Sequence, residues 1–342
     1  MNVRTAKQAA IRWVTEHASK EEWFQGAYFS GSIIEMQEET ELAEHSDVDI
    51  VVVMNLAEPP MKLGKFLYDG ALLEVTYLSM NQLKSAKEVL ISYHLAGSFR
   101  MDAIIEDPTG HLRELQSEVS LHFAEKEWVL RRCGNVMQKI QNGLNSIDVN
   151  APFYDLVTSW LFPTGITTHL ILVAALRNPT VRKRYLAVRE VLFKYGYEDI
   201  YNKLIDLLGC TELSPQRMEQ HLEHLAQTFD VAAAVAKTPF MFSTDITASA
   251  RPIAIDGSRE LIRAGNHREA VFWIVATFAR CHKILSVDAS PETLKAHLPA
   301  FEEMVADLGL RTNNDFICRA KDVSDFLPRL WEAAEDIVTR NN

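Results

Sequence analysis

Two aspartates, Asp47 and Asp49, stand one residue apart at the start of a β-branched, nearly continuous apolar segment, residues 48–54. Such a segment is typical of a buried strand. Because side chains alternate along a strand, both carboxylates should point to the same face, about 6–7 Å apart. There they could share one or two hard cations, and without a cation their repulsion should raise the pKa of one carboxyl. The spacing therefore predicts a divalent-cation site.

Three further residues could complete this site. Gly31 and Ser32 follow a short β-prone segment, residues 27–29. Glycine lets a backbone come close to a ligand, and a serine hydroxyl can hydrogen-bond a phosphate oxygen. Glu74 lies among apolar and β-branched residues, where an isolated carboxylate is costly unless it is paired or bound to metal. These residue types together indicate a site for a phosphate-bearing ligand and a cation.

A β-hairpin is expected to carry Glu74. Its strands are Lys65–Tyr68 and Ala71–Leu78, and the Asp69-Gly70 pair between them favours a type I′ turn, in which both central residues have positive φ. This hairpin could bring Glu74 to face the two aspartates. The other expected elements of the region are helices at residues 5–17, 80–91 (with Ser79 as N-cap) and 111–123, and short strands at residues 27–29 and 103–105.

Strand signals stop near residue 126. Beyond it the pattern predicts only helices, interrupted by Asn178-Pro179 and by a long loop at residues 237–252. Asn266 is an expected N-cap, with Glu269 in the capping-box position. We therefore predict an α+β protein with domains at residues 1–125 and 126–342. The expected helices of the second domain cover residues 126–144, 155–176, 181–195, 198–208, 215–236, 267–285, 291–308 and 322–340.

The order of the candidate residues resembles the polymerase-beta-like nucleotidyltransferase superfamily. Its signature is a Gly-Ser or Gly-Gly pair, a spacer, an acid-hydrophobic-acid triplet on a strand and a third acid on a later strand. Gly31-Ser32, Asp47-Val48-Asp49 and Glu74 match it. An α/β head followed by a helical tail is most like the aminoglycoside and related small-molecule nucleotidyltransferases. The resemblance implies a nucleotidyltransferase-type mixed sheet with flanking helices, followed by an all-α helical-bundle domain that binds substrate.

The same resemblance implies a reaction and the residues that perform it. Asp47 and Asp49 would be ligands of Mg²⁺, and Glu74 would either complete the metal site or act as general base. The transferase would move a nucleoside monophosphate, AMP if the donor is ATP, onto a hydroxyl of a small molecule and release pyrophosphate. The implied nucleotide-binding residues are Gly31, Ser32 and Ser46 in the first domain and Arg182, Lys183 and Arg184 in the second.

The segment between the Gly-Ser pair and the aspartates departs from the superfamily pattern. Where relatives often have Gly or Arg, residues 33–36 read Ile-Ile-Glu-Met, and four further glutamates follow, up to Glu44. Two other functions therefore stay open. One is a non-catalytic nucleotide-binding or interaction protein on the same fold, in which Glu74 belongs to a structural ion pair. The other is a protein-modifying nucleotidyltransferase of the antitoxin type.

Several other residues have a more ordinary expectation beside the functional one. On the helix expected at residues 181–195, Arg182 and Arg189 lie a heptad apart and share a face, which could be a solvated surface rather than a phosphate site. The remaining candidates are His267 and His282, expected to be surface or satisfied polar residues, the tryptophans Trp128, Trp160 and Trp273, expected in the core, and Tyr154 and Asp155, which could line an acceptor pocket.

Charge is distributed unevenly along the chain. The 342 residues have a formal net charge of −11. Residues 1–125 contain 20 acidic and 10 basic residues, which is a net charge of −10. The remainder holds 26 acidic and 25 basic residues, so the acidity belongs to the first domain. An acidic surface disfavours a general nucleic-acid binder and would attract a cationic co-substrate. Together with the resemblance, this charge makes an aminoglycoside-like polycation the first expected acceptor, and the alternative is that the acidic residues form a solvated, solubilising surface.

The expected setting is a cytoplasmic one. The four cysteines are scattered without metal-ligand spacing, and a disulfide framework is not expected in a chain of this size. The apolar runs at residues 170–176 and 270–279 are shorter than the roughly 20 residues of a membrane span, and residues 1–10 lack the apolar core of a secretory signal. We expect ATP or another nucleoside triphosphate and a small-molecule acceptor as partners, with no membrane. The oligomeric state stays open.

Overall fold

The computed structural model describes residues 1–43 and 45–341, and Glu44 and Asn342 lie outside them. The chain divides into two compact units, Met1–Arg132 and Cys133–Asn342. The division falls within helix α5 (Lys126–Asn145), whereas the sequence placed a domain boundary at the beginning of this helix. The catalytic and substrate-binding roles of the two domains stay predictions.

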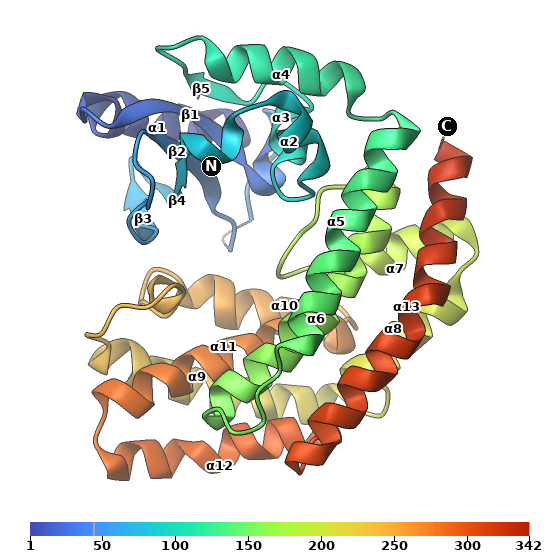
Figure 1. Ribbon diagram of the computed structural model, residues 1–342. Helices are drawn as coiled ribbons and strands as arrows, with labels where there is room; N and C mark the ends of the chain where they lie inside the picture. Colours follow the sequence, from blue (N-terminus) through green and yellow to red (C-terminus); the bar gives the residue numbers. More distant parts are fainter. Residues whose placement is uncertain (44, 342) are drawn as a thin grey trace. The chain divides into compact units, whose positions relative to one another are not determined.

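The first unit contains a mixed five-stranded sheet with strand order β3-β4-β2-β1-β5 (Figure 1). Strand β2 runs parallel to β4, and the other neighbouring strands are antiparallel. With the helices that follow, this sheet confirms the predicted α+β class. The strands are β1 (Phe24–Ser30), β2 (Val48–Met54), β3 (Gly64–Tyr68), β4 (Ala71–Ser79) and β5 (Ile104–Glu106).

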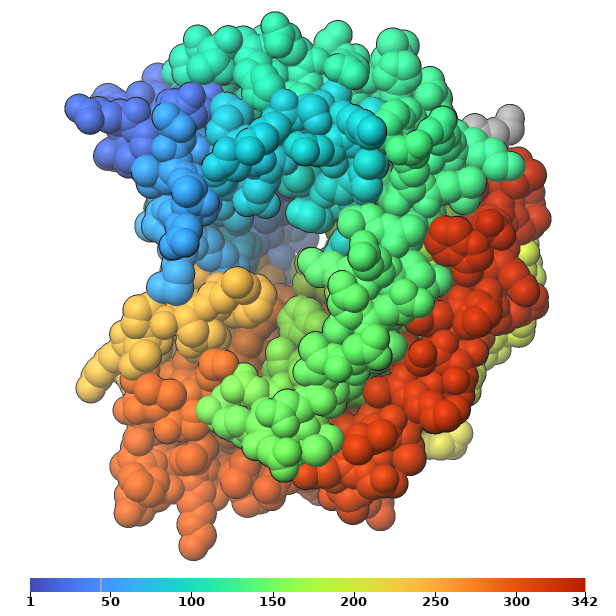
Figure 2. Space-filling model, viewed as in Figure 1, coloured from blue at the N-terminus to red at the C-terminus, as the bar shows by residue number. Residues whose placement is uncertain are grey.

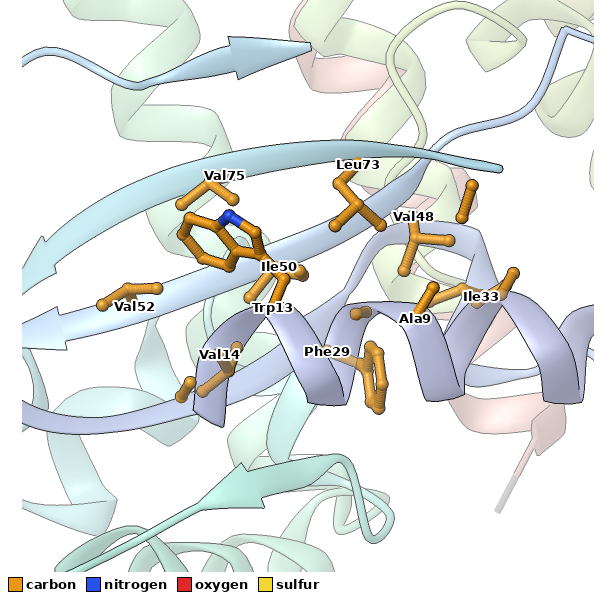
Figure 3. Packing of buried hydrophobic residues seen from close by; sticks show 14 of the residues in the cluster. Ala9, Trp13, Val14, Phe29, Ile33, Val48, Ile50, Val52, Leu73 and Val75 are labelled. Carbon is orange, nitrogen blue, oxygen red and sulfur yellow. The ribbon is translucent and has the colours of Figure 1, made fainter. Parts of the chain in front are cut away.

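Helix α1 (Val3–Glu16) covers one face of the sheet. Figure 3 shows Trp13 of this helix against Ile50 of β2 and Val75 of β4. Each fully buried large apolar side chain of this kind contributes about 1.5–3 kcal/mol. Asp49 directly precedes Ile50, and Glu74 directly precedes Val75. Because side chains alternate along a strand, both acids point to the opposite face.

The opposite face has its own apolar cluster, which includes Tyr28, Val53, Phe99 and Leu112. Three helices contribute to this cluster, α2 (Ala86–Ile91), α3 (Ala96–Phe99) and α4 (His111–His122). The single helix predicted at residues 80–91 is wrong. A 3-10 turn capped by Ser79 covers residues 80–83, and α2 begins after its own cap, Ser85, whose hydroxyl accepts from the backbone N–H of Glu88.

The predicted hairpin is confirmed. Asp69 and Gly70 have φ values of 47° and 78°, as a type I′ turn requires. The turn fixes the register of the two strands, so that Lys65 lies directly opposite Glu74.

The second unit is helical and is built around α6 (Phe153–Ala174) and α11 (His267–Asp288). Both are long and apolar enough to cross a membrane by length and composition, but 83% and 78% of their apolar windows are buried. Helix α13 (Asn313–Asn341) packs along α6 and exposes its outer side (Figures 1 and 2). The other helices are α7 (Arg184–Tyr195), α8 (Glu198–Leu208), α9 (Pro215–Val235), α10 (Gly257–Arg263) and α12 (Pro291–Asp307).

Two local predictions for this unit are wrong. Helix α7 begins at Arg184, so Arg182 precedes it and shares no helical face with Arg189. The capping box at Asn266 does not form, because the Asn266 side chain makes no cap hydrogen bond. Its Oδ1 accepts a hydrogen bond of 2.8 Å from Arg189, which also pairs with Glu269. A long-range ion pair therefore replaces the local cap.

Candidate metal centre

Three acids converge on the face of the sheet opposite α1. Parallel pairing of β2 and β4 sets Asp49 directly beside Glu74, and Asp47 precedes β2 by one residue. One carboxylate oxygen from each of the three lies within 4.8 Å of the others. Among residues 1–43 and 45–341, they are the one such group of His, Cys, Asp and Glu side chains. The structure thus brings together the three acids that the sequence singled out, which we call the acidic cluster.

Two lysines pair with the acidic cluster. The Lys62 ammonium lies 2.6 Å from Oε1 of Glu74, and the Lys65 ammonium lies 2.7 Å from Oδ2 of Asp47 and also contacts Oε2 of Glu74. The side chains of Lys65 and Glu74 are only 7% and 13% exposed. Because water screens these pairs less than surface pairs, their electrostatic energy is larger than that of an ordinary surface salt bridge.

The pKa of Asp49 is displaced in the predicted direction. Burial raises the pKa of this carboxyl to about 7, and repulsion from Asp47 acts in the same sense. The positive charges of Lys65 and Lys62 partly offset the rise. Near neutral pH, the Asp49 carboxyl is therefore protonated in part of the molecules unless a cation is bound.

Gly31 lies directly against the acidic cluster. It has φ of +67°, and a Cβ atom at this position would lie 1.9 Å from Oδ2 of Asp49. Only glycine leaves room for that carboxylate. Ser32 is exposed in the 3-10 turn Gly31–Ile34, and Ser46 is half-buried and donates its backbone N–H to Ala43. Nucleotide binding by these three residues stays a prediction.

The three basic residues Arg182, Lys183 and Arg184 of the second unit, which we call the basic trio, lie in different environments. Arg184 is only 2% exposed, stacks over the Phe272 ring at 3.8 Å and donates from Nε to the carbonyl of Val181. This packing argues against a direct contact between Arg184 and a phosphate. Lys183 is exposed and Arg182 is half-buried. For these two, nucleotide binding remains a prediction.

Sequence reasoning missed the two lysines. The type I′ turn alone fixes which residues face each other across the hairpin, so the pairing of Lys65 with Glu74 could have been read from the sequence. Lys62 lies in the loop before β3, where no register rule applies. The signal for one of the two partners was therefore present in the sequence.

The histidine expectations have mixed outcomes. His267 donates a hydrogen bond of 2.9 Å from Nε2 to the carbonyl of Leu213, whereas its Nδ1 is buried without a hydrogen-bond partner among the described residues, so the prediction of a satisfied polar residue holds at Nε2 only. His282 is buried, with no hydrogen-bond partner among the described residues at either ring nitrogen, and it stacks on Phe301 at 4.8 Å. Burial lowers its pKa to about 4. The prediction of a surface or satisfied residue is wrong for His282.

The remaining candidates are the tryptophans and the pair Tyr154 and Asp155 at the start of α6. Trp160 is fully buried, in agreement with its predicted core position, whereas Trp128 and Trp273 are half-buried. Asp155 pairs with Lys283 of α11 at 2.7 Å. Its place in an acceptor pocket, with Tyr154, stays a prediction.

Comparison with known proteins gives a weak likeness. No protein-family model and no curated protein matches the chain. Among solved structures, a nucleotidyltransferase-like protein from Exiguobacterium sibiricum matches with 16% sequence identity, over 76% of this chain and 91% of that chain. The TM-score is 0.30, which is too low to establish a common fold. The functional assignment therefore depends on the geometry of the acidic cluster.

Proposed function

We propose that this protein is a divalent-cation-dependent nucleotidyltransferase that moves a nucleoside monophosphate, AMP in the case of ATP, to a hydroxyl of a small molecule. The observation that carries the proposal is the approach of Asp47, Asp49 and Glu74 to within 4.8 Å, next to a glycine whose missing side chain makes room for a carboxylate. Carboxylates on neighbouring strands are a suitable base for phosphoryl-transfer chemistry, in which charge stabilisation and positioning supply most of the catalysis.

The donor set supports Mg²⁺ as the cation, because carboxylate oxygens are the ligands that hard cations prefer. Asp47 and Asp49 would hold it, and its presence would relieve the repulsion and desolvation that raise the pKa of Asp49. When bound, the ion would neutralise charge on the nucleotide phosphates and on the departing pyrophosphate.

Glu74 has two possible roles, and both require it to release a lysine. Its Oε1 accepts from Lys62 and its Oε2 from Lys65. To act as general base, one oxygen must exchange its lysine for the hydroxyl of the acceptor, whose proton it would then take. To act as a metal ligand, one oxygen must likewise turn from an ammonium group to the metal ion.

The acidic first unit supports a cationic acceptor. Residues 1–125 carry twice as many acidic as basic residues, 20 against 10. Such a field raises the local concentration of a polycation that bears hydroxyl groups, as an aminoglycoside does. The acceptor class is therefore proposed from charge, and the donor from the acidic cluster.

One observation favours a second candidate, a nucleotide-binding protein without catalysis. The pairing of Glu74 with Lys62 and Lys65 satisfies this carboxylate without a metal ion. If the lysines remain in place when a nucleotide binds, the chain would bind the nucleotide without any dependence on Mg²⁺. Calorimetric titration with an ATP analogue, with and without Mg²⁺, separates the two candidates.

The direct test is pyrophosphate release from ATP and Mg²⁺ across a panel of hydroxylated acceptors. We expect Asp49→Asn to lower the rate by at least about a hundredfold, since metal-assisted charge stabilisation is worth several kcal/mol. Asp69→Asn is the matched control, because Asp69 is an exposed aspartate of the same unit in the hairpin turn. Equal rates for wild type and Asp49→Asn would reject the proposal. Labelled ATP in cell lysate tests the protein-modifying alternative, for which the label would appear in protein.

A further inference from the structure

One lysine and two acids lie side by side across three neighbouring strands. Lys65 on β3 lies opposite Glu74 on β4, and Glu74 lies opposite Asp49 on β2. Lys65 also reaches Asp47, so a single ammonium group bridges two of the three acids. The cluster therefore holds three carboxylates and two ammonium groups in close contact.

This arrangement makes the lysines competitors of a metal ion. The Lys65 ammonium contacts oxygens of two carboxylates that a divalent ion would also need. Hydrogen bonds between charged groups are stronger than those between neutral groups, so their loss must be offset when a metal ion enters. A displaced ammonium group with 7% exposure also needs another anion close by, because an unpaired buried charge is costly.

We propose that Lys62 and Lys65 couple metal binding to phosphate binding in the acidic cluster. Without ligand, the two ammonium groups neutralise Glu74 and Asp47 and keep the affinity for a divalent cation low. A phosphate-bearing ligand takes up the ammonium groups that the cation displaces, so cation and nucleotide bind tightly only together. This inference rests on the proposed nucleotidyltransferase function and assigns the two lysines to the same site.

The chemistry of the displaced groups selects the ligand. Two ammonium groups that lose carboxylate partners require a ligand with at least two anionic oxygens, which a phosphate-bearing ligand provides. A neutral nucleoside offers no such replacement. The coupling therefore favours entry of the metal ion together with a phosphate-bearing nucleotide rather than with a nucleoside.

The experiment measures two affinities in the full-length protein. One is the affinity for Mn²⁺ alone, by paramagnetic resonance, and the other is the affinity for a non-hydrolysable ATP analogue at saturating Mn²⁺. We expect Lys65→Met to tighten Mn²⁺ binding about tenfold and to weaken analogue binding about tenfold, since each change removes about one charge-assisted interaction. Lys62→Met should act in the same two directions, because Lys62 pairs with Glu74 and its charge also acts on Asp49.

Opposite changes in the two affinities are the signature, because a damaged fold would weaken both. Lys65→Arg keeps the positive charge and should keep Mn²⁺ binding weak. Arg12→Met, which breaks the exposed pair of Arg12 with Asp69, should change neither affinity. If wild type and Lys65→Met bind Mn²⁺ equally, the coupling is refuted while the proposed function stands. If neither protein binds Mn²⁺ with or without the analogue, both are refuted.

Discussion

The buried charges of the acidic cluster in the first unit and of Arg280 in the second unit are neutralised by different kinds of partner. In the acidic cluster, three carboxylates share two ammonium groups that come from a loop and an edge strand. Arg280 is 7% exposed and lies 3.1 Å from Asp245, with the rings of Phe242 and Trp273 at 4.7 and 5.0 Å from its guanidinium. One site has an excess of oxygen donors, and the other has one acid for one base between aromatic faces.

The difference separates a site that can exchange its cation from one that cannot. A guanidinium held between aromatic rings is stabilised by cation–π contacts as well as by its carboxylate, and a metal ion would find a single carboxylate there. In the acidic cluster the cations are flexible lysine side chains, and the carboxylates outnumber them. The buried charge of Arg280 therefore serves packing, whereas the acidic cluster has the excess of carboxylates that the proposed metal site requires.

The largest expected effect comes from breaking the charge pair of the second unit. Asp245→Asn leaves the guanidinium of Arg280 buried without its carboxylate, and removal of one partner of a buried pair costs about 3–5 kcal/mol. We expect the free energy of unfolding, measured in urea by tryptophan fluorescence, to fall by about 3 kcal/mol. Mn²⁺ affinity should not change. A fall below about 1 kcal/mol would show that the aromatic rings alone stabilise the arginine.

The opposite result is expected for an aspartate of the acidic cluster. The raised pKa of Asp49, about 7, means that between about pH 4 and 7 the folded protein holds a proton that the unfolded chain has lost. This contribution to stability is present at low pH and is lost as the pH rises through 7. Asp49→Asn removes the charged form and should stabilise the metal-free protein at pH 8 by about 2 kcal/mol, with no gain at pH 4.

Thermal unfolding in the presence of EDTA at the two pH values measures this gain. A loss of stability at pH 8 would contradict the displaced pKa of Asp49. The same variant should lose Mn²⁺ binding, so stability and ligand binding would change in opposite directions. Asp245→Asn should instead lower stability alone, and this contrast tests the comparison directly.

The sequence was informative where local rules decide the structure. The Asp69-Gly70 turn fixes the hairpin, and the alternation around Glu74 fixes the face to which it points. The parallel register of Asp49 with Glu74 was not readable, because a crossover rather than a turn joins β2 and β4. The acids were therefore identified from their types and order, and their mutual distance needed the structure.

Long-range pairing explains what the sequence missed in the second unit. Asn266 and Glu269 have the residue types and spacing of a capping box. Arg189, which lies far away in the sequence, instead donates a hydrogen bond to Asn266 and forms an ion pair with Glu269. Arg184 belongs to a basic run, yet the ring of Phe272 covers it. In both cases a partner distant in sequence outweighs the local preference, and no local pattern reports such a partner.

A pH-dependent effect is expected at a buried histidine of the second unit. Burial lowers the pKa of His282 to about 4, so between about pH 6.5 and 4 the unfolded chain binds a proton that the folded protein excludes. Its contribution to stability is therefore lost as the pH falls, by about 1.4 kcal/mol per pH unit. His282→Phe keeps an aromatic ring beside Phe278 and Phe301 and should reduce this slope.

The readout is the slope of unfolding free energy against pH between 6 and 4.5 (roughly the range in which the two states differ in bound protons), because the larger ring changes packing equally at every pH. His297→Phe is not a suitable control, since His297 hydrogen-bonds Thr228 and contributes to the lowered pKa of His282. His17→Phe, in the first unit, is suitable. An unchanged slope in His282→Phe would mean that His282 does not titrate in this way.

The smallest expected effect on stability is at Lys183. This side chain is exposed directly before α7, and surface substitutions of this kind change the free energy of unfolding by at most about 0.5 kcal/mol. If Lys183 contacts a nucleotide phosphate, as the superfamily resemblance implies, Lys183→Ala should weaken binding of the ATP analogue about threefold, within the range for a single exposed charge. Lys295→Ala, an exposed lysine on α12, is the control and should change neither quantity. Equal affinities for both variants would remove Lys183 from the nucleotide site.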